Sequence, residues 1–76
     1  MSLVLVTRRG CHLCDQALDL LRSLGHEPEL RDVDAEDELH NLYDWRVPVL
    51  LLDGRVVAEG KIERAKLEKA MRLGAR

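Results

Sequence analysis

The 76-residue sequence lacks any apolar run approaching the ~20 residues that a transmembrane helix needs. Its first six residues have neither the basic segment nor the long apolar segment of a secretory signal, so we expect them to form a strand instead. Repeats, low-complexity segments and linkers are also missing, and a chain this short supports one modest core. These absences predict a single cytoplasmic domain over residues 1–76 that has no membrane partner.

An excess of positive charge is missing too. The formal net charge is −2 at pH 7, which argues against a dedicated nucleic-acid-binding protein. Hydrophobic residues make up 46% of the chain and charged residues 34%, which is too apolar for a disordered segment and ordinary for a folded one. The composition therefore predicts a small folded domain.

Cysteine is scarce, and both cysteines lie in the segment Cys11-His12-Leu13-Cys14. A tetrahedral zinc site needs about four nitrogen or sulfur ligands, and the three histidines form no spaced second pair. Haem attachment requires histidine directly after the second cysteine, where this chain has Asp15. In a reducing cytosol the spacing favours a redox-active dithiol, with metal binding and inert packing of the two thiols as alternatives.

The position of the pair, between an apolar strand and an amphipathic helix, favours thiol chemistry. Only the thiolate attacks a disulfide, and a helix N-terminus stabilises that anion through its unpaired N–H groups and partial positive charge. We therefore expect Cys11 to be the more exposed, attacking thiol and Cys14 to be the resolving thiol. His12 is either a cation that stabilises the thiolate or an exposed side chain without a role.

The first half of the chain predicts a strand, a helix and a weaker strand. Residues 3–6 are continuously apolar and consist of leucine and the β-branched residue valine, and Gly10 permits the turn that follows them. Leu13, Ala17, Leu18, Leu21 and Leu24 trace one face of a helix that Gly25 ends. Residues 27–33 contain a proline and alternate imperfectly, which is typical of an edge strand.

The second half predicts a short helix, a hairpin and a final helix. Asp34 is expected to cap the short helix, whose buried residues would be Leu39, Leu42 and Tyr43. Strands over 47–52 and 55–58 flank Asp53-Gly54, a pair typical of a type I′ turn. Gly60 then opens a helix over 62–73, with Leu67, Ala70 and Met71 toward the core. Tyr43 and Trp45 could line a groove near Pro48, although a core position for one of them is the default.

The resulting element order is β-α-β-α-β-β-α. The first two strands and the helix between them imply a right-handed parallel crossover, and the closing hairpin must be antiparallel. The fold class is therefore α/β, with a mixed four-stranded sheet and helices on both faces.

Two motifs carry a resemblance to a known family: Gly-Cys-His-Leu-Cys at 10–14 and Arg-Val-Pro-Val-Leu at 46–50. In combination they resemble the small bacterial glutaredoxin-like proteins of the thioredoxin fold, and the likeness covers nearly the whole chain. The resemblance implies that Pro48 is cis and lies against the cysteine pair. It also implies that the backbone of Val47 hydrogen-bonds an extended substrate segment across from Cys11.

The chain departs from glutaredoxins where they hold glutathione. Of the Gly-Gly-x-Asp-like turn that binds the γ-glutamyl group, only Gly60 matches here. Arg8 stands three positions before Cys11, where glutaredoxins often have lysine, and is expected to pair with a substrate carboxylate. The alternative for Arg8 and Arg9 is a pair of solvated loop charges.

Taken together, these features predict a monomeric thiol-disulfide oxidoreductase. Its substrates would be protein disulfides or glutathione disulfide, and its electrons would come from glutathione or a flavoprotein reductase. The protein itself would need no resident cofactor. One alternative is a non-enzymatic thioredoxin-fold adaptor or metal-binding module that uses the same dithiol. Another is iron–sulfur assembly on paired monomers with glutathione as co-ligand.

Overall fold

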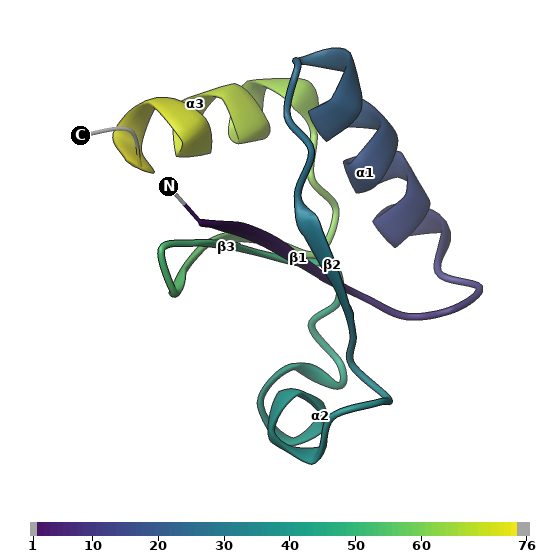
Figure 1. Ribbon diagram of the computed structural model, residues 1–76. Helices are drawn as coiled ribbons and strands as arrows, with labels where there is room; N and C mark the ends of the chain where they lie inside the picture. The colour runs from purple at the N-terminus through teal and green to yellow at the C-terminus, as the bar shows by residue number, and fades with distance from the viewer. Residues whose placement is uncertain (1, 75–76) are drawn as a thin grey trace.

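The computed structural model describes residues 2–74, which form a four-stranded sheet with helices on both faces (Figure 1). The strand order is β2-β1-β3-β4, so the first strand lies in the interior of the sheet and the second at an edge. The strands are β1 (Leu3–Thr7), β2 (Glu29–Asp32), β3 (Val49–Leu52) and β4 (Arg55–Glu59). The predicted element order, the mixed sheet and the edge position of the proline-flanked strand are confirmed.

The sheet register brings two chain segments to the same edge of the molecule. β1 runs parallel to β2 and antiparallel to β3, with Val6 opposite Val49. Because Val6 is near the end of β1 and Val49 begins β3, the segment leaving β1 and the segment entering β3 emerge side by side. These two segments carry Cys11 and Pro48, respectively, and we call this edge the cysteine end.

The β3–β4 connection is the tight turn that the sequence predicts. Asp53 and Gly54 both have positive φ angles, 51° and 83°, as a type I′ turn requires. The backbone N–H of Asp53 donates to the carbonyl of Ser2, and the backbone N–H of Ser2 donates to the carboxylate of Asp53, both at 2.8 Å. These bonds lie at the end of the sheet opposite to Cys11. The hairpin is therefore tied to the start of the chain.

The helices are distributed unequally over the two faces of the sheet. Helices α1 (His12–Ser23) and α3 (Arg64–Gly74) cover one face, and the short helix α2 (Asp37–Tyr43) lies on the other (Figure 1). None of the helices within residues 2–74 has the length and apolar character needed to cross a membrane.

Each face has its own hydrophobic core, built from aliphatic side chains because the chain has no phenylalanine. The larger core contains Leu5, Ala17, Leu21, Leu50, Ala58, Ile62, Leu67 and Ala70. The smaller core, under α2, contains Val6, Val33, Leu39 and Val49. Tyr43 packs partly buried against the smaller core, whereas Trp45 is 92% exposed, so one of the two aromatic residues takes the expected core position.

Two predictions about burial and capping on the α2 side are wrong. Asp34 does not cap α2, because its carboxylate accepts hydrogen bonds from Arg8 and the helix begins after Glu36 instead. Leu42 is 51% exposed, because Leu39 and Tyr43, four residues apart, already occupy the side of α2 that faces the sheet.

Three other predictions need smaller corrections. Leu13 lies in the first turn of α1 and is 38% exposed, whereas the helical period places it with the buried residues. The third strand begins at Val49, two residues later than predicted. The last helix begins at Arg64, and Gly60 lies before it in a bend with a φ of 69° that glycine adopts without strain.

Candidate functional site

The two cysteines occupy the start of α1 with different exposure. Cys11 is the N-cap residue with an extended backbone, and its Sγ accepts a hydrogen bond of 3.1 Å from the backbone N–H of Cys14. Cys11 is half-buried, whereas Cys14 is 2% exposed. Their Cα atoms are 5.2 Å apart and their sulfurs are joined as a disulfide. The expected order of exposure, Cys11 over Cys14, is confirmed.

The loop before α1 holds Cys11 at the helix end. Gly10 has a φ of 78°, and the backbone N–H of Cys11 donates to the carbonyl of Arg8 at 3.2 Å. The carbonyl of Cys11 accepts from the N–H of Asp15 at 3.1 Å, which begins the hydrogen bonding of the helix. The Cys11 sulfur therefore lies where unpaired helix N–H groups favour a negative charge.

The Val47–Pro48 segment lies at the same edge of the sheet. The peptide bond between Val47 and Pro48 is cis, as the resemblance implied, and Pro48 is fully buried. The carbonyl of Pro48 accepts a 2.9 Å hydrogen bond from the N–H of Gly60. Val47 is half-buried, and within residues 2–74 its backbone N–H and carbonyl take part in no hydrogen bond. Its backbone is thus available to a bound segment, whereas the N–H of Gly60 is already used.

Arg8 is the centre of a polar cluster that joins three loops. Its guanidinium donates to both carboxylate oxygens of Asp34 at 2.9 Å. It also donates to the carboxylate of Asp44 and, at 3.1 Å, to the Asp44 carbonyl. Asp34 precedes α2 and Asp44 follows it, so Arg8 ties both ends of this helix to the segment that leads into Cys11.

The cluster has two electrostatic consequences. Hydrogen bonding from Arg8 lowers the pKa of the Asp34 carboxyl below its usual range, and the same contacts raise the already high pKa of Arg8. Oxygen and nitrogen atoms of Asp34, His40 and Asp44 also lie within 4.8 Å of one another, a spacing that could suit a metal ion. The Arg8 guanidinium is hydrogen-bonded to both aspartates, so the protein itself already supplies a positive charge to these carboxylates.

Sequence patterns alone did not reveal the partners of Arg8. Asp34 and Asp44 stand 26 and 36 residues from Arg8, and only the folded sheet brings them together. An aspartate on each side of a short helix was the available signal. Arg8 is thus hydrogen-bonded to two aspartates of the protein itself. That it pairs with a substrate carboxylate stays a prediction.

His12 and Arg9 are exposed on either side of Cys11. Neither side chain forms a hydrogen bond or ion pair with any residue between 2 and 74. The cysteine end therefore has an exposed arginine before Cys11 and an exposed histidine after it.

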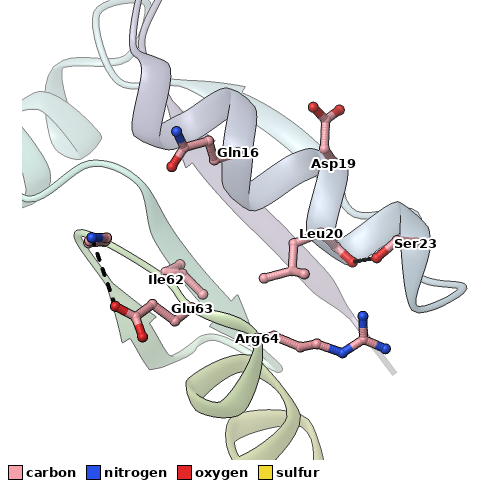
Figure 2. A pocket seen from close by; sticks show the side chains of 8 residues that line it. Gln16, Asp19, Leu20, Ser23, Ile62, Glu63 and Arg64 are labelled. Atoms are coloured by element: carbon pink, nitrogen blue, oxygen red, sulfur yellow. Dashed lines mark hydrogen bonds and ion pairs between the residues drawn. The ribbon is translucent and has the colours of Figure 1, made fainter.

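One surface hollow beside α1 reaches a cysteine, and a larger one does not. A hollow of about 360 Å³ lies beside Cys14 and is lined by the Thr7–Gly10 loop, the first turns of α1 and β2. A larger one of about 550 Å³ separates α1 from the start of α3. Figure 2 shows Leu20 and Ile62 pointing toward each other across it, with Gln16, Asp19 and Arg64 at its rim. No cysteine lines the larger hollow.

The fold and the paired cysteines define a thioredoxin-like protein of the glutaredoxin type. Residues 2–72 match the family described as Glutaredoxin-like domain (DUF836), and the chain belongs to this family.

Solved structures agree with this assignment. An X. campestris structural-genomics protein, XcR50, is 30% identical with a TM-score of 0.83, covering 95% of this chain and 97% of its own. Protein Ne2328 from Nitrosomonas europaea is 30% identical with a TM-score of 0.75, over 90% and 87% of the two chains. The thioredoxin-like protein BC3987 is 27% identical with a TM-score of 0.72, over 91% and 99%. A glutaredoxin-like fold with a neighbouring cysteine pair supports a redox-type role for this chain.

Proposed function

We propose that the protein is a thiol-disulfide oxidoreductase in which Cys11 attacks and Cys14 resolves. One observation carries the proposal: the half-buried Cys11 sulfur caps α1, while the sulfur that can bond to it belongs to the buried Cys14. An attacking thiol must reach a disulfide in solution, and a resolving thiol must reach only its partner. The unequal exposure of the two sulfurs meets both requirements.

The reaction consists of two thiol-disulfide exchanges. The Cys11 thiolate attacks one sulfur of a substrate disulfide, forming a mixed disulfide and releasing the other substrate sulfur as a thiolate. The Cys14 thiolate then attacks the Cys11 sulfur and releases the second substrate thiolate. Two electrons pass to the substrate, which takes up two protons, and the protein is left with the Cys11–Cys14 disulfide. Glutathione or a flavoprotein reductase would return the pair to the dithiol form.

The surrounding groups support this chemistry. The unpaired backbone groups of Val47 can align an extended substrate segment beside Cys11, in the manner of a short added strand. A protonated His12 would stabilise the Cys11 thiolate. Arg8 acts in this scheme as a positioning residue, because its contacts with Asp34 and Asp44 hold the loop that leads to Cys11.

A redox titration tests the proposal. The protein is equilibrated in graded glutathione buffers, alkylated, and examined by intact mass. We expect one reversible step between a dialkylated dithiol and an unalkylated internal disulfide, and little glutathione adduct because the Cys14 sulfur can reach Cys11 and displace glutathione from it. An abundant single adduct on Cys11 would instead indicate monothiol chemistry of the glutathione-dependent type.

The same preparation tests the metal-binding alternative. Protein purified under reducing conditions is assayed for zinc and iron before the titration. Stoichiometric metal held by Cys11 and Cys14, with no reversible disulfide, would contradict the proposal and favour a metal-binding module.

A further inference from the structure

Exposed apolar side chains occur in the chain segments that border the cysteine end. The large hydrophobic side chains that the structure leaves exposed are Leu13, Leu30, Leu42, Trp45 and Val56. Three of them come from the Cys11–Cys14 segment, the last turn of α2 and the loop between α2 and β3. We call Leu13, Leu42 and Trp45 the cysteine-end apolar surface.

Trp45 is the largest member of this surface and is 92% exposed. It follows Asp44, whose carboxylate and carbonyl both accept hydrogen bonds from Arg8, three residues before Cys11. After it, the N–H of Arg46 donates to the carbonyl of Tyr43 at 2.9 Å. The backbone that carries the indole is therefore fixed beside the cysteine loop. An aromatic side chain on a fixed backbone binds a partner with little loss of conformational freedom.

Leu42 extends the apolar area of Trp45. The two residues are three positions apart, and the intervening Asp44 keeps helical angles of −45° and −50°. This spacing places the two side chains on one side of a helical turn. Tryptophan is also among the residues that contribute most to protein–protein binding when a partner covers it. A partner that covers Trp45 can therefore also contact Leu42.

Arg9 lines the hollow beside Cys14, together with Asp15 and Asp32. Arg9 is exposed two residues before Cys11, and no carboxylate of residues 2–74 lies within ion-pair distance of it. The aspartates of the neighbouring cluster, Asp34 and Asp44, are bonded to Arg8. A complementary partner would therefore offer apolar side chains and a carboxylate next to its disulfide.

We propose that the cysteine-end apolar surface docks a polypeptide whose disulfide is flanked by leucine-like side chains and an acidic residue. Trp45 is the apolar anchor and Arg9 the charged contact. The inference rests on the proposed redox function and gives that function a substrate class: polypeptide disulfides flanked by apolar side chains, in preference to disulfides that lack such neighbours.

Two disulfide-linked peptide dimers test the preference. One has Asp-Leu-Cys-Leu around its cysteine and the other has Lys-Ser-Cys-Ser. Reduced protein is mixed with each, acid-quenched, and the growth of the internal disulfide is followed by mass. Each rate constant is divided by that of dithiothreitol with the same peptide, which removes differences in intrinsic disulfide reactivity.

We expect the wild-type protein to prefer the leucine peptide by about tenfold or more, the scale of an anchor residue. Trp45→Ala should remove most of this preference and Trp45→Phe should retain most of it. Arg9→Gln should remove a smaller part of the preference for the leucine peptide. High salt should remove the same part from the wild type, because exposed charges are screened. The matched control Val56→Ala, an exposed apolar side chain on β4, should leave the preference unchanged.

Three results would overturn the inference. A Trp45→Ala protein that keeps the preference would show that the indole is not the anchor. Equal normalised rates with both peptides would refute the substrate class while leaving the redox function intact. A wild-type protein that reduces neither peptide, although dithiothreitol reduces both, would refute the redox function itself.

Discussion

The two faces of the sheet are held by different kinds of interaction. Among residues 2–72, the core beneath α1 and α3 has eight buried residues, whereas the core beneath α2 has four. α2 is also only seven residues long, and both of its ends are tied to Arg8 by hydrogen bonds. One face thus depends on apolar burial, and the other combines a small core with a polar cluster beside Cys11. Polar contacts, which fix the relative orientation of two groups, are therefore found where the loops of the site meet.

The larger core should be the most sensitive part of the molecule. Leu21→Ala removes a fully buried side chain beneath α1 and should lower the free energy of unfolding by about 2–5 kcal/mol. Urea unfolding followed by circular dichroism measures this loss. The control Leu42→Ala truncates an exposed leucine on α2 and should stay within about 0.5 kcal/mol. Equal losses for the two variants would refute the assigned burial.

The smaller core should be less sensitive. Val33→Ala removes two buried carbon atoms beneath α2 and should lower the free energy of unfolding by about 1–2 kcal/mol. Amide hydrogen exchange in the variant should accelerate in α2 more than in α1, because the two helices pack on separate cores. A loss as large as that of Leu21→Ala, or equal acceleration in both helices, would show that the faces unfold as one unit.

Arg8 should affect the site more than global stability. Arg8→Gln breaks ion pairs that are partly exposed, and such pairs contribute little to unfolding free energy. We expect faster hydrogen exchange in α2 and slower disulfide exchange at Cys11, with a smaller stability loss than that of Val33→Ala. The matched control is Arg22→Gln, which breaks the exposed pair with Glu27 on the far end of α1. If both arginine variants behave alike, the cluster does not position the cysteine loop.

The smallest effect is a pH dependence on the α2 side. The pKa of Asp34 is lowered in the folded protein, chiefly by hydrogen bonding from Arg8. A lowered folded pKa means that the carboxylate stabilises the fold above its unfolded pKa of about 4, and that this stabilisation is lost as the pH falls through the folded value. The stability difference between wild type and Asp34→Asn should therefore shrink between about pH 5 and pH 2. A difference independent of pH would contradict the assigned pair.

Local patterns predicted much of the fold, and tertiary pairing explains the rest. Gly10, Gly25 and Asp53-Gly54 mark chain reversals through backbone conformation, which is a local property, so the element order followed from them. Asp34 has the chemistry of a helix cap, but the folded chain gives its carboxylate to Arg8 instead. Leu42 fits the helical period, yet Leu39 and Tyr43 already occupy the side of α2 that packs on the smaller core.

The candidate site divides in the same way. The Cys11–Cys14 spacing and its place before a helix are local, so the pair and its order of exposure could be predicted. The polar cluster around Arg8 and the exposed indole of Trp45 depend on how distant loops meet. No period or spacing in the chain encodes those contacts.

The most direct test of the redox claim is to trap the mixed disulfide. Reduced Cys14→Ser protein is mixed with the leucine peptide dimer, quenched, and digested to locate the adduct by mass. We predict one peptide attached to Cys11 in this variant, no trapped adduct in wild type, and no adduct on the Cys14 thiol of the Cys11→Ser protein because that side chain is buried. Trapping through Cys14 with none through Cys11 would reverse the assigned roles, and the absence of any adduct would contradict the proposed function.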